Sequence, residues 1–225
     1  AWAGDPSGSV TGAAADVTAE IAGEPTGDEL AAELGHVKTS LNLFFVIFGG
    51  ALVFFMQAGF AMVETGFCRS KNAVHVIMTN FVIFAIGVIA YWAVGFALMF
   101  GGVGTLATLG ATQSLDGLTQ IAPDWGVFGH TGFFLSGSTY DVAILGFFFF
   151  QMVFMDTTAT IPTGAMAERW KFSAFVVYGF FIAAILYPIF GSWVWGGGWL
   201  AALGRNLGLG HGAVDFAGSS VVHAV

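Results

Sequence analysis

The stretch NLFFVIFGGALVFFMQAGFAMVETG, residues 42–66, contains a single charged residue, Glu64. At about 1.5 Å of rise per residue, a helix of this length crosses the roughly 30 Å of hydrocarbon in a bilayer. Further apolar stretches follow at residues 73–102, 142–167 and 172–203, and a fifth begins near Asp215 and reaches Val225. The fifth is too short to cross a bilayer. The sequence therefore predicts an all-α polytopic membrane protein with about five transmembrane helices, the fifth truncated.

The composition agrees with this class and excludes several others. Of the 225 residues, 56% are apolar and 9% are charged, whereas soluble domains carry about a quarter charged residues. The net charge of −8, without any basic patch, argues against a nucleic-acid partner. Cys68 is the only cysteine, so neither an intrachain disulfide nor a cysteine-based metal site is expected. No metal site or cofactor is predicted.

Lysine and arginine predict the orientation. Four of the six lie in two very short loops, residues 68–72 and 168–171, whereas the long loop 103–140 has none. Positive charge collects in cytoplasmic loops. We therefore expect a multi-pass protein of the plasma (inner) membrane, with its N-terminus and the 103–140 loop on the extracytoplasmic side.

The segment before the first apolar stretch has a different character. Residues 1–38 carry seven acidic residues and one basic residue, Lys38. We divide the chain into an extracytoplasmic acidic segment, 1–41, and a membrane domain, 42–225. A start at Ala1 fits a removed signal peptide and equally an arbitrary boundary. Thr26 and Glu29 have the spacing of a capping box, which predicts that a short helix begins there.

Five residues in the apolar part are candidates for function. Phe150 and Phe154 are four residues apart on the third stretch, so their rings are expected to stack along one helix face. Trp195 lies near the outer end of the fourth stretch, Asp215 opens the fifth, and His223 lies inside it. Lipid contact and packing explain the aromatic residues equally well, and helix capping explains the aspartate. For His223 a function is favoured, because an ionisable group inside a membrane is costly.

Together these residues describe a path for a small cation. Aromatic faces attract cations, and a pair of rings can close the path and exclude water. A neutral imidazole beyond the rings would not compensate the charge of a bare ion in a low dielectric. The imidazole can, however, hold a proton. A cation that can lose its proton therefore fits better than Na⁺ or K⁺. Asp215 and His223 are too far apart for a direct hydrogen bond, and no nucleophile or phosphate loop accompanies them, so an enzyme is not expected.

Asp156 fits no such scheme. It lies within the third apolar stretch, and pairing with Thr157, with Thr158 or with a neighbouring helix is the favoured interpretation.

With these residues in place, the chain closely resembles the ammonium transporters of the Amt/Mep/Rh superfamily, bacterial Amt branch. The matching stretches are residues 59–72 (GFAMVETGFCRSKN), 150–154 (FQMVF), 164–174 (GAMAERWKFSA), 194–198 (VWGGG) and 215–223 (DFAGSSVVH). The resemblance implies an eleven-helix bundle of two inverted five-helix repeats, of which this chain supplies the first. It also implies a homotrimer and a possible cytoplasmic regulatory protein as partners, besides the lipid bilayer.

The resemblance assigns roles to the five candidates. Trp195 and Phe154 match residues that line an external ammonium recruitment site; Phe154 is also the outer gate phenylalanine, and Phe150 its neighbour. Asp215 matches an aspartate that orders the site, and His223 the first of two pore histidines.

The implied function is transport of ammonium/ammonia, with methylammonium as an analogue, by deprotonation and passage of ammonia. The alternative is an ammonium sensor that signals to a cytoplasmic output domain. The second gate phenylalanine, a recruitment serine and the second histidine belong to the other repeat.

Overall fold

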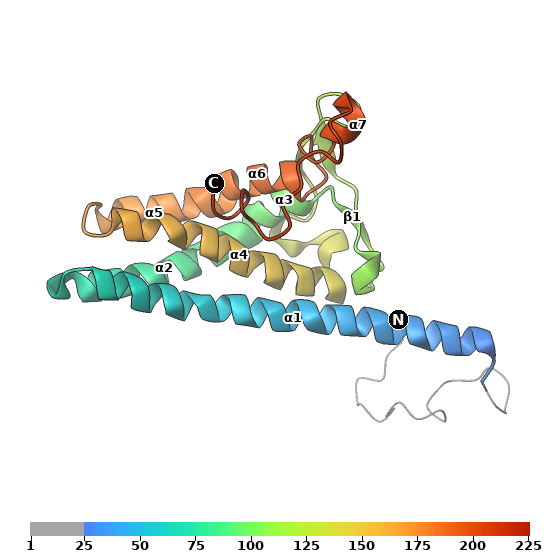
Figure 1. Ribbon diagram of the computed structural model, residues 1–225, viewed down its shortest axis with the longest axis horizontal. Coiled ribbons are helices and arrows are strands. Elements are labelled where there is room, and N and C mark those ends of the chain that lie inside the picture. The colour runs from blue at the N-terminus through green and yellow to red at the C-terminus, as the bar shows by residue number, and fades with distance from the viewer. Residues whose placement is uncertain (1–24) are drawn as a thin grey trace.

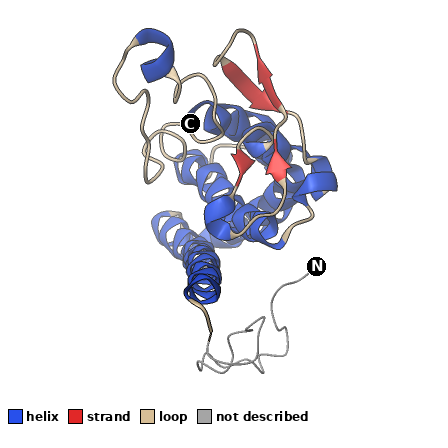
Figure 2. Ribbon diagram, turned by 90° about the vertical axis from the view of Figure 1, so that its right-hand side faces the viewer, coloured by secondary structure: helices blue, strands red, loops and turns tan. Residues whose placement is uncertain are grey.

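Four helical passages lie along one another in a computed structural model that describes residues 25–225 (Figure 1). They comprise Gly27–Phe67, Ser70–Phe100, Val142–Met166 and Phe172–Val194, and each is long and apolar enough to cross a membrane. Seen end-on, the helices gather into one bundle, with short strands and loops at one end (Figure 2). The polytopic all-α architecture predicted from the apolar stretches is confirmed.

The elements have the following bounds. The α-helices are α1 (Gly27–Phe67), α2 (Ala73–Ala90), α3 (Phe96–Phe100), α4 (Val142–Met166), α5 (Phe172–Phe181), α6 (Tyr187–Val194) and α7 (Leu203–Leu207). The antiparallel strand pairs are β1 (Gly104–Thr105) with β2 (Ser114–Leu115), and β3 (Leu118–Gln120) with β4 (Gly126–Gly129). Short 3₁₀ turns cover Ser70–Asn72, Ala107–Leu109, Phe133–Leu135 and Gly137–Thr139.

Helix α1 begins at the predicted capping box. The Glu29 backbone N–H donates to the Thr26 hydroxyl at 3.3 Å, and the Thr26 N–H donates back to the Glu29 carboxylate at 2.7 Å. The helix is not short, however, since it continues without a break for 41 residues to Phe67. At about 1.5 Å per residue it is about 60 Å long, twice the hydrocarbon thickness. The division of the chain at residue 41 therefore marks no break in the helix and remains a prediction of where the membrane begins. The acidic residues up to position 24 lie outside the described residues.

Two of the passages contain a π-helical turn. η3 (Tyr91–Gly95) joins α2 to α3, and η7 (Ile182–Leu186) joins α5 to α6. The two turns pack closely, because a Cβ atom at Gly95 would clash with the Ala183 carbonyl oxygen. Around them the rings of Tyr91, Phe96 and Tyr187 are fully buried and form the centre of the core.

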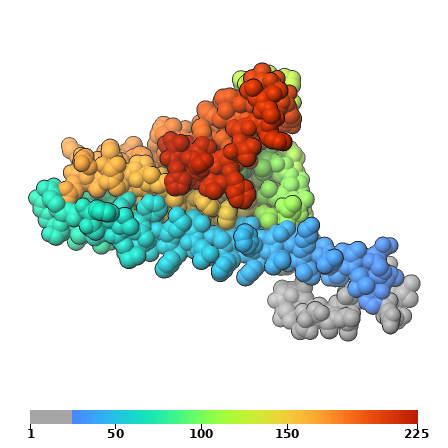
Figure 3. Space-filling view, viewed as in Figure 1, coloured from blue at the N-terminus to red at the C-terminus, as the bar shows by residue number. Residues whose placement is uncertain are grey.

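The chain after α6 departs from the predicted spans. The fourth passage ends at Val194 rather than at residue 203, and residues after it turn back through α7. From Asp215 onward the backbone forms hydrogen-bonded turns, in which the Val222 N–H donates to Gly218 at 2.9 Å. Residues 215–225 therefore form hydrogen-bonded turns rather than the regular fifth helix that the sequence predicts. This terminal segment lies over the bundle, with Val221 and Val222 buried in the core (Figure 3).

Candidate functional site

The Asp215 carboxylate organises the terminal segment. Its Oδ1 accepts hydrogen bonds from the Gly218 N–H at 2.7 Å and from the N–H and hydroxyl of Ser219 at 2.9 and 3.4 Å. Its Oδ2 accepts from the N–H and hydroxyl of Ser220 at 2.8 and 2.6 Å and from the Val221 N–H at 2.8 Å. Six donors therefore converge on the carboxylate of a residue that is 9% exposed. Asp215 therefore fixes the backbone between itself and His223.

Trp195 is tied to the same segment. Its indole Nε1–H donates to the Asp215 carbonyl oxygen at 2.6 Å, which joins the end of α6 to the start of the terminal turns. Gly218, in the left-handed region at φ +95°, lies beneath the indole: a Cβ atom there would be 3.5 Å from the Trp195 ring. The predicted candidates Trp195 and Asp215, twenty residues apart in sequence, are thus in direct contact.

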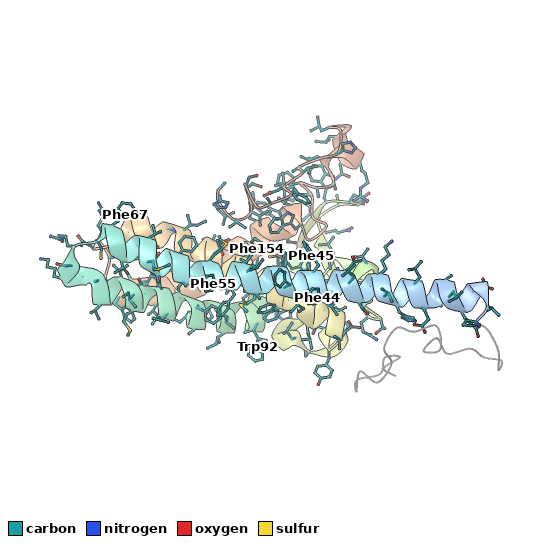
Figure 4. All side chains as sticks on the ribbon, turned by 60° about the horizontal axis from the view of Figure 1, so that its bottom comes forward. Phe44, Phe45, Phe55, Phe67, Trp92 and Phe154 are labelled. Atoms are coloured by element: carbon teal, nitrogen blue, oxygen red, sulfur yellow. The ribbon has the colours of Figure 1, made fainter. Side chains whose placement is uncertain are left out.

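Phe150 and Phe154 lie on one face of α4, as their spacing predicts. Their ring centroids are 5.0 Å apart, but the ring planes are inclined by 58°, so the rings are tilted rather than stacked. Both rings are half-buried. Phe154 packs against the hydrophobic core that contains Val222, and Trp195 packs against the same core. Figure 4 places Phe154 level with the middle of α1. Phe154 of the aromatic pair and Trp195 of the Trp195–Asp215 pair thus pack against one hydrophobic cluster.

The His223 side chain is exposed in this part of the protein. Its backbone N–H donates to Gly218 at 3.1 Å, and within residues 25–225 no side chain is hydrogen-bonded to its imidazole. The chain folds around Val221 and Val222 instead, and leaves the histidine on the outer side of the turn. The structure therefore holds the backbone of His223 in place without enclosing its ring.

Asp156 lies in α4 and is 2% exposed. The expected pairing with its neighbours is wrong, because the Thr157 hydroxyl donates to the Val153 carbonyl and the Thr158 hydroxyl to the Phe154 carbonyl. Threonine in a helix commonly makes such bonds to the preceding turn. The Asp156 Oδ1 has no hydrogen-bond partner among the described residues.

A polar network that sequence reasoning missed lies toward the short basic loops. Glu64, on α1, is 7% exposed and accepts hydrogen bonds from Asn80 Nδ2 at 2.7 Å and from the Thr163 hydroxyl. Gln57 donates to the Asn80 side chain at 3.2 Å and accepts from Thr160 at 3.2 Å. Gln57 and Glu64 are seven residues apart, which places both on one face of an apolar helix. This spacing is the feature of the sequence that could have predicted the network. Among the described residues, no cluster of histidine, cysteine and acidic side chains is arranged to hold a metal.

Comparison with known proteins matches most of the chain to one family. The profile of the Ammonium Transporter Family matches residues 43–225. The chain is 43% identical over 212 residues to "Ammonium transporter Amt2" of Archaeoglobus fulgidus, covering 93% of this chain and 40% of that relative. It is 37% identical over 190 residues to "Ammonium transporter 1 member 3" of Solanum lycopersicum, covering 84% and 37%.

A solved structure is similar as well. The fold matches that of a "Sensor Amt Protein" with a TM-score of 0.67 at 36% identity, covering 84% of this chain and 42% of the other. The chain thus spans about two fifths of the length of the relatives it matches. This agrees with the expectation that it supplies one part of a larger bundle.

Proposed function

Because the chain belongs to the ammonium transporter family, we propose that it forms the first half of a protein that moves ammonium or ammonia across the plasma membrane. The observation that carries the proposal is the contact between Trp195 and Asp215 on the same hydrophobic cluster as Phe154. An indole face held in place by a carboxylate-ordered turn is suited to receive a small cation. Transport, rather than enzymatic chemistry, is the activity that the family supports.

In this proposal the five predicted residues act in sequence. Trp195 and Phe154 receive ammonium from the extracytoplasmic side, with Phe150 beside them, and Asp215 keeps their geometry. The Phe154 ring closes the path to water, and ammonia continues alone after the cation has lost its proton. The His223 imidazole faces outward from this half, which leaves it available to line a pore completed by the rest of the protein.

The proposed orientation and assembly follow from charge and exposure. The short loops that carry Arg69, Lys71, Arg169 and Lys171 face the cytoplasm, so that the N-terminal segment is extracytoplasmic. Large apolar side chains are exposed along α1, among them Phe44, Phe45, Phe55 and Phe67 (Figure 4). Lipid, the second half of the protein and other subunits of a homotrimer would cover this face. A cytoplasmic regulatory protein would dock on the basic loops.

Electrical recording from the full-length protein tests the proposal. Liposomes that contain it are adsorbed to a solid-supported membrane and pulsed with ammonium, methylammonium, Na⁺ or K⁺. We expect a saturable current with ammonium, a smaller one with methylammonium and none with the metal ions. The His223→Ala variant is expected to lose the current. An intact ammonium current in that variant would show that His223 has no part in the pore.

A second function has one specific observation in its favour. The solved structure that this fold matches is that of a "Sensor Amt Protein", and the residues that receive the cation would serve a receptor equally well. In that case the full-length protein would bind ammonium and signal to a cytoplasmic output domain. Calorimetric binding of ammonium to full-length protein that carries no current would favour the sensor over the transporter.

A further inference from the structure

The network around Glu64 joins three helices by side-chain hydrogen bonds. It runs from Thr160 on α4 through Gln57 on α1 to Asn80 on α2, and ends at Glu64 and Thr163. Glu64 is the only ionisable member. Buried polar groups in a membrane protein hold helices together, and that alone would explain the amides and hydroxyls. It does not explain a carboxylate at the end of the chain of bonds.

The carboxylate end of the network opens into a cavity. The cavity has a volume of about 590 Å³ and lies between the ends of α1 and α4, at the end of α1 labelled Phe67 in Figure 4. Glu64 and Gly164 both line it. A Cβ atom at Gly164 would lie 3.6 Å from the Glu64 Oε1, so the glycine leaves the carboxylate within reach of the cavity. Glu64 therefore connects the polar interior with the side of the basic loops.

The charged groups of the cavity wall are bonded elsewhere. Arg69 is paired with Glu168 at 2.7 Å, and the Arg169 Nη1 donates to the Ala165 carbonyl at 2.8 Å. The remaining titratable group of the wall, Cys68, donates to the Thr65 carbonyl at 3.2 Å. Within residues 25–225, Glu64 thus has hydrogen-bond donors but no ion-pair partner. Asp156, which lies about two turns from Thr163 on α4, is the other buried carboxyl group of this region.

The position of the network along α4 relates it to the gate. Thr160 and Thr163 follow Phe154 by six and nine residues, which places them about 9 and 14 Å farther along the helix. The network therefore begins beyond the ring that closes the proposed path and ends near the short basic loops.

We propose that Glu64 exchanges protons between the interior and this cavity, and that it releases on the basic-loop side the proton that ammonium has lost. This inference rests on the proposed transport function. When ammonium gives up its proton, an N–H bond breaks and the carboxylate takes that proton to form an O–H bond. The O–H bond then breaks when the proton passes to water in the cavity. Carboxyl groups inside membranes are characteristic of such relays, because taking a proton relieves the cost of a buried charge.

Two variants separate proton exchange from helix packing in the full-length protein. Glu64→Gln keeps the size of the side chain but cannot take up a proton, whereas Thr163→Val removes a hydrogen bond from the same network and leaves the carboxyl. Glu33→Gln, at a half-buried carboxylate near the start of the same helix, is the control. We expect the ammonium current to fall at least tenfold in Glu64→Gln and to change less than threefold in the other two. A wild-type current in Glu64→Gln, or an equal loss in Thr163→Val, would overturn the proposal.

A second measurement does not depend on transport. Infrared difference spectra between pH 8 and pH 5 are expected to show a protonated-carboxyl band that disappears in Glu64→Gln and persists in Asp156→Asn. If the wild type carries no ammonium current, the transport function fails, and this band still reports whether Glu64 exchanges protons. A spectrum unchanged by Glu64→Gln would refute exchange at this residue whatever the current.

Discussion

Glu168 holds Arg69 at two atoms: its Oε2 accepts from the Arg69 Nε at 2.7 Å and its Oε1 from the Arg69 backbone N–H at 2.8 Å. Asn72 Nδ2 donates to the same Oε1 at 2.8 Å. Arg69 and Asn72 belong to the loop between α1 and α2, and Glu168 to the loop between α4 and α5. One carboxylate thus joins two helix hairpins at the basic-loop end, although 99 residues separate Arg69 from Glu168.

Replacing Glu168 should loosen this junction. Glu168→Ala removes all three acceptor contacts and also leaves a side chain at φ +65°, a left-handed conformation that glycine adopts more readily. We expect the unfolding temperature of the full-length protein in detergent to fall by a few degrees, and Glu168→Gly to be less harmful than Glu168→Ala. Scanning fluorimetry measures both. Equal unfolding temperatures for wild type and Glu168→Ala would mean that the junction contributes nothing to stability.

The same carboxylate should make stability depend on acid pH. Hydrogen bonds from Asn72 and Arg69 lower the pKa of Glu168 from 4.5 to about 2. A lowered pKa gives a stabilisation that is complete above the ordinary value of 4.5 and disappears as the pH falls toward 2. We therefore expect the difference in unfolding temperature between wild type and Glu168→Gln to be constant from pH 7 to pH 5 and to shrink below pH 4. A difference that stays constant down to pH 3 would contradict this.

Gly95 should tolerate no side chain, because its π-turn lies against the Ala183 carbonyl. Gly95→Ala is expected to destabilise the protein by about 1–3 kcal/mol, the usual cost of overpacking. Gly35→Ala is the matched control, since no atom lies within 4 Å of a Cβ at that exposed position of α1. There alanine should be neutral or stabilising by up to about 1 kcal/mol. Scanning fluorimetry distinguishes the two, and equal effects would place the π-turns farther apart than the structure does.

Local features of the chain could be predicted from the sequence. The apolar stretches gave four passages because length and hydrophobicity alone decide whether a helix can cross a bilayer. The start of α1 at Thr26 was predictable because the capping box joins residues only three apart. The helical continuity from Thr26 into the membrane was not predicted, since the polar composition before residue 42 suggested a separate segment.

Contacts between distant residues could not be predicted in this way. The bond from Thr163 to Glu64 joins residues 99 positions apart, and only packing of α4 on α1 brings them together. The ring of His223 is exposed because Val221 and Val222 take the buried positions in a turn whose path no periodicity predicts. The motif predicts which residues form the site, but their geometry depends on tertiary structure.

Asp215 should be essential to the shape of the terminal segment. In Asp215→Asn the amide nitrogen cannot accept the bonds that the carboxylate receives, so at least one of the N–H groups of Ser220 and Val221 would lose its partner. We expect a loss of about 1–3 kcal/mol in stability, the cost of unsatisfied buried groups, and a large fall in the ammonium current. Asp116→Asn, at an exposed loop carboxylate, is the control. Wild-type stability and current in Asp215→Asn would show that the turn holds without the charge.

Trp195→Phe tests whether the hydrogen bond from the indole to Asp215 contributes to ammonium binding. Phenylalanine keeps an aromatic face but cannot donate to the Asp215 carbonyl, whose bond from Nε1 is 2.6 Å long. Loss of one hydrogen bond of about 1–1.5 kcal/mol corresponds to about a tenfold change in an equilibrium constant. We therefore expect the half-saturating ammonium concentration to rise about tenfold, with the maximal current retained. Trp92→Phe, at a half-exposed indole that packs edge-on against Phe134 away from Asp215, should leave both quantities unchanged. Equal shifts in the two variants would show that the effect comes from general packing rather than from the Trp195–Asp215 contact.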